Sequence, residues 1–191
     1  MKKIVFATSN PHKLEELKAI CAEKCDVEFV LPPTGFDPLE DGTTFEANSL
    51  KKAKEAACVS KMPALADDSG LCVDALDGGP GIHSARYAET AQKRIDKLLD
   101  VLKNVENRRA KFVCVMTLVD ENGNVLAQKR GECYGEIAHS QSGTHGFGYD
   151  PVFIVKDTEK TMAELSDEQK NKISHRAKAL EQMIEYLKEY K

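Results

Sequence analysis

The sequence predicts an α/β protein with a mixed β-sheet and flanking helices. Strand-like apolar runs alternate with helical segments along the chain, and two long strand-like runs, 111–120 and 125–137, flank the turn sequence ENGN. The alternation of strands and helices favours parallel strand pairs, whereas the hairpin requires an antiparallel pair. Both kinds of pair are therefore expected in one sheet. With 191 residues, 41% of them hydrophobic, the chain fits a single domain, 1–191, with a substantial core.

The individual elements follow from apolar periodicity, helix caps and turn residues. Strands are expected at 3–7, 27–30, 63–66, 71–76, 111–120, 125–137 and 152–155. Helices are expected after Pro11, from Thr43 to just before Pro63, over about 90–105, and from about 161 to the C-terminus, where Ser166 and Gln169 form a capping pair. The segment 31–42, rich in proline and glycine, is expected to be a loop.

Charge and composition exclude several classes of protein. The net charge is −4 and the 27 basic residues are scattered among 31 acidic ones, so no nucleic-acid partner is expected. No apolar run reaches the roughly 18 residues of a membrane helix, so we expect no membrane partner. The apolar stretch in the first ten residues is too short for a secretory signal, so we expect a cytoplasmic location. The six cysteines are spread singly, which indicates reduced core residues rather than a zinc site.

The segment TSNPHK at 8–13 joins the first strand to the first helix. Pro11 suits the first helical turn and Asn10 or Ser9 suits the cap. The free N–H groups of a helix start attract phosphate, and Lys13 would add a positive charge. An ordinary capped turn with a solvated lysine is the alternative.

The segment ADDSG at 66–70 places two carboxylates at an expected junction between strand and turn. Because neighbours on an extended backbone point to opposite sides, only one of Asp67 and Asp68 can face a given site. Carboxylate oxygens suit Mg²⁺, and Glu40 is the preferred second ligand, because Glu46 is expected to serve as the capping-box partner of Thr43. An acidic turn held by its own hydrogen bonds is the alternative.

Two later segments carry aromatic and cationic groups. The glycine-rich segment GTHGFGYDP at 143–151 could offer an aromatic face to a base, or be merely a flexible connection. In KNKISHR at 170–176, Ser174 is expected to cap a final helix that begins with His175 and Arg176, which favours anions; a surface charge run is the alternative.

These motifs in this order, TSNPHK, ADDSG followed by GGPGIHSARYA, GFGYDP and SHR, resemble the inosine/xanthosine triphosphate pyrophosphatase family, also called Ham1-like or non-canonical purine NTP pyrophosphatases. The resemblance spans nearly the whole chain, and the joint order is specific although each motif alone is weak. It implies an elongated structure whose two lobes flank an active-site cleft, and a homodimer. It also implies Mg²⁺-dependent hydrolysis of ITP, dITP and XTP to the monophosphate and pyrophosphate, which removes these nucleotides from the pool.

The resemblance further implies roles for single residues. Asp68 is implied to be the general base and, with Glu40, a ligand of Mg²⁺. The residues implied to bind the purine nucleoside triphosphate are Thr8, Ser9, Asn10, Pro11, His12, Lys13, Ser69, Phe147, Gly148, Tyr149, Asp150, Lys170, His175 and Arg176. Within this mechanism Lys13 and Lys170 offset phosphate charge, Phe147 or Tyr149 stacks on the purine, and His175 and Arg176 donate to its 6-keto oxygen.

One position departs from the family pattern. The family usually shows F-x-E-N-A in the second helix, whereas this chain has Phe45, Glu46, Ala47, Asn48 and Ser49. Ala47 thus stands where glutamate is expected, and a shift of one residue rotates Glu46 by about 100° around a helix. A role for Glu46 is therefore not expected to follow from the resemblance.

Three other functions stay open on the sequence alone. The first is the same chemistry with a different base, as in a pyrimidine-directed pyrophosphatase. The second is a nucleotide sensor without catalysis, against which Glu40, Asp68 and Ser69 argue, because binding alone needs no carboxylate to orient water. The third is a phosphomonoesterase, which would release orthophosphate instead of pyrophosphate.

Overall fold

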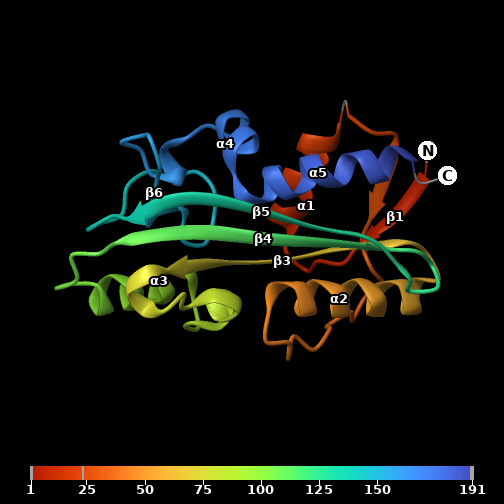
Figure 1. Ribbon diagram of the computed structural model, residues 1–191, viewed down its shortest axis with the longest axis horizontal. Helices are drawn as coiled ribbons and strands as arrows, with labels where there is room; N and C mark the ends of the chain where they lie inside the picture. The colour runs from red at the N-terminus through yellow and green to blue at the C-terminus, as the bar shows by residue number, and fades with distance from the viewer. Residues whose placement is uncertain (1, 23, 190–191) are drawn as a thin grey trace. The chain divides into compact units, whose positions relative to one another are not determined.

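The computed structural model describes residues 2–22 and 24–189 and contains one mixed sheet (Figure 1). The strands are β1 (Lys2–Phe6), β2 (Val27–Val30), β3 (Ala64–Val73), β4 (Arg109–Val119), β5 (Val125–Ile137) and β6 (Phe153–Val155), in the order β2-β1-β3-β4-β5-β6. β1 pairs in parallel with β2 and β3, and β6 pairs antiparallel with β5. The predicted α/β class and mixed sheet are confirmed.

Five α-helices accompany the sheet in the described residues: α1 (Pro11–Cys21), α2 (Phe45–Ser60), α3 (Ala91–Val101), α4 (Asp167–Ile173) and α5 (His175–Glu189). Asn10 caps α1 by accepting from His12 N–H, and Pro11 occupies the first turn, as predicted. The capping box of Ser166 and Gln169 is also present, at the start of α4. None of the described helices is long and apolar enough to cross a membrane.

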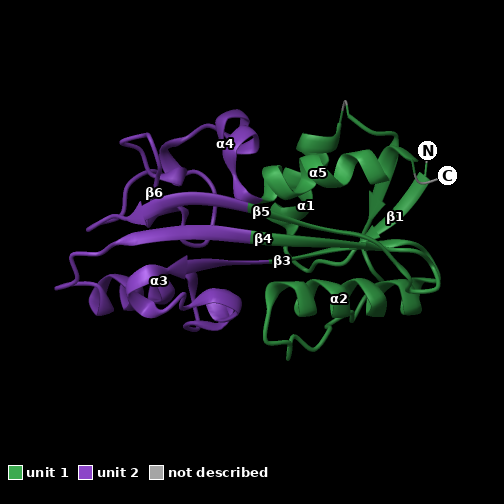
Figure 2. Cartoon of the chain, in the orientation of Figure 1, with its two compact units in different colours: residues 1–68, 114–131, 176–191 green, residues 69–113, 132–175 purple. Residues whose placement is uncertain are grey.

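The chain divides into two compact units (Figure 2). Unit 1 comprises 1–68, 114–131 and 176–191, and unit 2 comprises 69–113 and 132–175. Unit 1 contains two hydrophobic cores and unit 2 contains one, each built from described residues distant in sequence.

Unit 1 covers both faces of its part of the sheet with helices. Ile4 and Phe6 of β1 pack in the core that contains residues of α1 and α5, whereas Val5 and Ala7 pack in the core that contains the alanines of α2. β3 repeats this alternation: Leu65 belongs to the first core, and its neighbours on either side to the second. The side of the sheet to which a residue of β1 or β3 points therefore decides which helices its side chain contacts.

Unit 2 packs α3 and the segment before β6 against the remaining lengths of β3, β4 and β5. Its core includes Leu71 and Val73 of β3, Leu98 of α3, and the ring pair Phe112 and Phe153, whose centroids are 4.5 Å apart. A buried Arg108 donates to the carbonyl oxygens of Leu102, Ile137 and Ala138.

Three predictions about elements need correction, and one is confirmed. The residues of ADDSG form no turn, because β3 runs unbroken through them. Gly70 makes this possible, since a Cβ there would lie 2.1 Å from the Gly81 carbonyl oxygen. The predicted C-terminal helix is divided at Ser174, where α4 ends and α5 begins, and the predicted third helix ends earlier, at Val101. The predicted hairpin is confirmed: β4 and β5 are sheet neighbours joined by 120–124.

Candidate active site

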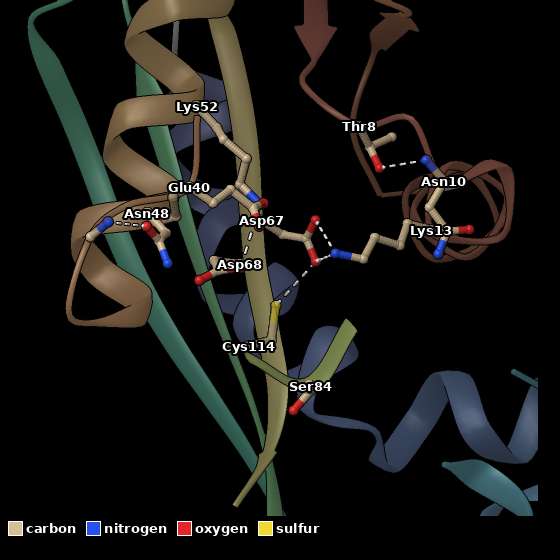
Figure 3. A network of polar contacts seen from close by, with 12 residues as sticks. Thr8, Asn10, Lys13, Glu40, Asn48, Lys52, Asp67, Asp68, Ser84 and Cys114 are labelled. Carbon is tan, nitrogen blue, oxygen red and sulfur yellow. Dashed lines mark hydrogen bonds and ion pairs between the residues drawn. The ribbon is translucent and has the colours of Figure 1, made fainter. Parts of the chain in front are cut away.

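β3 directs two adjacent carboxylates to opposite faces of the sheet in unit 1 (Figure 3). Asp67 points to the same side of the sheet as Leu65 and contacts side chains of α1 and α5. Asp68 points to the same side of the sheet as Ala66 and contacts a side chain of α2. Both residues are buried, with exposed fractions of 1% for Asp67 and 5% for Asp68 as whole residues. The expectation that the two neighbouring side chains point to opposite sides of the strand is confirmed.

Asp67 is the centre of a buried ion-pair cluster. Lys13 Nζ lies 3.0 Å from each of its carboxylate oxygens, and Arg176 Nη2 lies 3.2 Å from Oδ2. The Cys114 thiol on β4 is 3.9 Å from the same oxygen. Arg176, only 1% exposed, also donates to Glu16 of α1. Two charged side chains from two helices are therefore fixed by one strand residue.

These contacts determine the charge state of the cluster. Burial opposes ionisation of Asp67, but Lys13, Arg176 and Lys52 together hold the pKa of its carboxyl well below the ordinary value. Burial and the negative charge of Asp67 raise the pKa of the Cys114 thiol to about 12. At neutral pH Asp67 is therefore a permanent anion and Cys114 a neutral thiol.

On the other face of the sheet, Asp68 shares a lysine with Glu40. Lys52 Nζ of α2 lies 2.6 Å from Glu40 Oε1 and 3.4 Å from Asp68 Oδ1. The lysine side chain is 8% exposed, as is that of Asp68, whereas that of Glu40 is 25% exposed. The two carboxylates predicted to bind a metal thus converge on one ammonium group.

The pKa of Asp68 is raised, in contrast to that of Asp67. Burial is the largest cause, and the negative charges of Glu40 and Asp67 add to it, while Lys52 and Asn48 oppose the increase. Burial would lower the pKa of Lys52, but the surrounding carboxylates raise it above its ordinary value. Asp68 is consequently the more basic of the two neighbouring carboxylates.

The residues of TSNPHK lie at the start of α1, where Lys13 meets Asp67. The Thr8 hydroxyl oxygen, in a buried side chain, accepts from Asn10 N–H at 3.1 Å. Ser9, Pro11 and His12 are exposed. The structure therefore brings the predicted phosphate-binding helix start and one of the ADDSG carboxylates, Asp67, together within unit 1.

Unit 2 gathers a second set of predicted residues around Asp150. Its carboxylate accepts from Lys170 Nζ at 2.7 Å and from Phe147 N–H at 2.9 Å, and the Lys170 ammonium lies 4.6 Å from the centroid of the Phe147 ring. The turn requires glycine at 146, because φ is +73° and a Cβ would lie 2.1 Å from Asp150 Oδ2. Gly148 follows in the same left-handed region, with φ +64°.

The two predicted stacking residues differ in access. Tyr149 is 5% exposed, belongs to the core of unit 2 and donates its hydroxyl to the Ser84 carbonyl oxygen. Phe147 is only partly buried and is therefore the better placed of the two to meet a ligand. His175 stacks on Phe112 with ring centroids 4.8 Å apart. The remaining predicted residue, Ser69, lies in β3 two positions after Asp67 and therefore points to the same side of the strand.

Sequence reasoning missed Lys52 and Glu16. The available signal for Lys52 was its position in the second helix, within a stripe of small buried residues that includes Ala53 and Ala56. A lysine there needs a buried partner. Glu16, on the partly buried side of α1, carried no comparable signal.

The expected capping box at the start of α2 is absent. Thr44, not Thr43, is the cap and accepts from Ala47 N–H, so the third helical position holds an alanine that cannot return a bond. Glu46 instead pairs with Arg130 at 2.7 Å, and both side chains are about 40% exposed. Glu46 therefore does not replace the glutamate of the family pattern.

The capped start of α1, with Lys13 bound to Asp67, is of the kind that binds phosphate groups, because the first N–H groups of a helix are free to meet an anion. The chain belongs to the Ham1 family, whose model matches residues 4–186. It is 44% identical over 184 residues to a protein of Synechocystis sp. named dITP/XTP pyrophosphatase, covering 96% of this chain and 94% of the relative. A protein of the same name from Nostoc sp. is 45% identical, with 96% and 93% covered.

Solved structures of the same family share the fold. A HAM1 protein from Coxiella burnetii superimposes with a TM-score of 0.89 at 40% identity, covering 99% of this chain and all of the other. The Ham1 protein of Staphylococcus aureus gives 0.88 at 41% identity, with both chains covered completely. The family resemblance predicted from the motifs is confirmed.

Asp67→Asn tests the role of the ion-pair cluster in stability. The change leaves Lys13 and the buried Arg176 with less compensating charge, so we expect a loss of about 3 kcal/mol in the free energy of unfolding at pH 7, measured with urea. Because the folded-state pKa is depressed, the stability from this carboxylate is present above about pH 4 and is lost as pH falls through the folded pKa. The variant should therefore lose less stability than the wild type between pH 4 and pH 2.

Asp74→Asn is the matched control, since Asp74 is half-exposed and 3.5 Å from Arg109. Exposed pairs contribute less than about 1 kcal/mol. Equal stability of the wild type and Asp67→Asn at pH 7 would contradict the role of Asp67 as the centre of the cluster.

Proposed function

We propose that this protein hydrolyses the non-canonical purine nucleoside triphosphates ITP, dITP and XTP to the monophosphate and pyrophosphate, with Mg²⁺. The observation that carries the proposal is the convergence of Glu40 and Asp68 on Lys52, with the neighbouring strand residue Asp67 bound to Lys13 of α1. The names of relatives about 44% identical over nearly their whole length support the same substrate class.

The formal charge of the ion-pair groups around Asp67 and Asp68 supports a cation as part of the substrate complex. Four carboxylates, Glu16, Glu40, Asp67 and Asp68, face three cationic side chains, which leaves a formal charge of −1. A triphosphate would be repelled by such a cluster unless a cation came with it. A nucleotide bound as its Mg²⁺ complex meets this requirement.

The donor set fits Mg²⁺. Glu40 and Asp68 supply hard oxygen ligands, and Asp68 Oδ2 is a buried oxygen that makes no hydrogen bond with the described residues. Bound there, Mg²⁺ would supply phosphate coordination and charge stabilisation. Lys52 would exchange part of its contact with the two carboxylates for a phosphate oxygen.

The hydrolytic step assigns one proton transfer to this chain. Water oxygen attacks the α-phosphorus, the bond from that phosphorus to the bridging oxygen breaks, and pyrophosphate leaves with the electron pair. Asp68 takes the water proton, a role that its raised pKa favours. The N–H groups at the start of α1 and the ammonium of Lys13 would hold the phosphates, while Asp67 keeps that ammonium in place.

Residues of unit 2 would bind the base. Phe147 would stack on the purine, and His175 would donate to the 6-keto oxygen, where adenine carries an amino group. Lys170 and Asp150 fix the Phe147 turn. Arg176 is held between Glu16 and Asp67, so its predicted base contact would require exchange of one of these bonds.

A homodimer and a cytoplasmic location belong to the same proposal. Both were expected from the sequence, the first through the family resemblance. A cytoplasmic enzyme would have direct access to the free nucleotide pool.

Asp68→Asn should reduce pyrophosphate release from dITP by about 10²–10⁴-fold, because an amide cannot accept the water proton. The measurement is initial rate with ITP, dITP, XTP, GTP and ATP at saturating Mg²⁺. The wild type should release pyrophosphate from the first three and much less from GTP and ATP, and Asp74→Asn should behave as the wild type.

Near-normal turnover by a folded, nucleotide-binding Asp68→Asn would exclude Asp68 as the base. Orthophosphate as product would favour a phosphomonoesterase instead. Binding of nucleotides without any turnover by the wild type would favour a sensor.

His175→Ala should lower the ratio of kcat/KM for dITP to that for dATP by about tenfold, the effect of one lost specific hydrogen bond. Phe147→Ala is the comparison variant, because stacking does not distinguish ring substituents; it should lower kcat/KM for both nucleotides by a similar factor. A selectivity ratio that stays the same in His175→Ala would contradict the base-reading role.

A further inference from the structure

The loop that carries Glu40 is fastened to α2 by three successive residues. Glu40 pairs with Lys52 and Asp41 with Lys51, each at 2.6 Å, and Gly42 N–H donates to Asn48 Oδ1 at 2.8 Å. On α2, Lys51 and Lys52 follow Asn48 by three and four residues, so each lies next to Asn48 on the helix surface. The position of Glu40 therefore depends on this part of the α2 surface.

Asn48 is the completely buried member of the three partners, with an exposed fraction of 0%. Its contact with Gly42 is close, because a Cβ on Gly42 would lie 2.6 Å from Asn48 Oδ1. Since Oδ1 accepts from Gly42, the amide nitrogen must point the other way. Two N–H donors are thereby given a fixed direction.

That direction leads to Asp68 (Figure 3). The Asn48 amide is near enough to the carboxyl of Asp68 to lower its pKa. Neither Asn48 Nδ2 nor Asp68 Oδ2, both buried, completes a hydrogen bond of normal geometry with the described residues. Such a pair, one donor and one acceptor, is costly unless it is used when the site is filled.

We propose that Asn48 is a positioning residue that couples the two carboxylates of the active site. Its Oδ1 holds the Glu40 loop through Gly42, and its Nδ2 orients the Asp68 carboxylate and the water bound to it. Lys52 joins the same two carboxylates by charge, but its flexible side chain does not fix their orientation. The inference rests on the proposed function for its kinetic consequence and on the contacts of Gly42 alone for its structural consequence.

Asn48→Ala should release the loop without removing a charge. Exchange of the Gly42 amide proton, measured by NMR on the free protein, should become at least about tenfold faster, since one buried acceptor is lost. With dITP, the Mg²⁺ concentration for half-maximal pyrophosphate release should increase by at least about fivefold, while the KM for the nucleotide changes less than twofold. Lys51→Ala is the control, because it cuts the exposed neighbouring contact, and both quantities should stay within about twofold of the wild type.

Asn48→Asp separates the two halves of the amide. A carboxylate still accepts from Gly42 N–H, so the exchange rate should stay within about threefold of the wild type. It cannot donate to Asp68, so kcat should fall by at least about tenfold. If this variant does not fold, Gly42→Ala serves instead: its Cβ displaces Oδ1, and we expect the same increase in Mg²⁺ requirement as in Asn48→Ala.

Unchanged Gly42 exchange in a folded Asn48→Ala would overturn the proposal, whatever the enzyme's activity. Wild-type kcat in a folded Asn48→Asp would overturn the part played by Nδ2. A wild type that releases no pyrophosphate would instead contradict the proposed function, while the exchange measurement would still decide whether Asn48 holds the loop.

Discussion

The alternation of side chains along β3 is the constraint on which the site depends. One peptide step separates Asp67, which faces α1 and α5, from Asp68, which faces α2. Neither direction can change without reversing the neighbouring core positions, because Leu65 and Ala66 follow the same alternation. The packing of the core therefore assigns different electrostatic surroundings to two chemically identical groups.

In the proposed mechanism, these different surroundings give the two carboxylates different uses. Asp67 receives a lysine and an arginine and is held ionised, so it organises cations that would meet phosphate. Burial raises the pKa of Asp68 and Lys52 opposes the increase only in part, so in the proposed mechanism Asp68 suits a base and a metal ligand. Removing charges from water costs free energy, which the ion pairs of Asp67 offset in the absence of a ligand. Around Asp68 the compensation is incomplete, and a bound cation would complete it.

The sequence predicted most of the fold because its signals are local. Asn10, Pro11 and the ENGN turn act within a few residues, and each gave the predicted element. The unbroken course of β3 was not predictable, since the need for Gly70 comes from Gly81, which approaches it only in the folded chain. The cap at Thr44 differed from the prediction by one residue, which removed the expected role of Glu46 as a capping partner.

The site was predictable to the extent that its residues form continuous motifs. TSNPHK and ADDSG are brought together in unit 1, but the partners that hold them, Glu16 and Lys52, lie in helices without a motif of their own. The partial exposure of Phe147 and the burial of Tyr149 are likewise properties of the packed chain. Residue type alone could not distinguish these two aromatic side chains.

Hydrolysis of dITP in ¹⁸O-labelled water would show which phosphorus atom the water attacks. If the water attacks the α-phosphorus, we expect one ¹⁸O atom in the nucleoside monophosphate and none in the pyrophosphate after a single turnover, as measured by mass spectrometry. Label in the pyrophosphate and none in the monophosphate would place the attack on the β-phosphorus, and would contradict the assignment of Asp68 and its partners to the α-phosphorus.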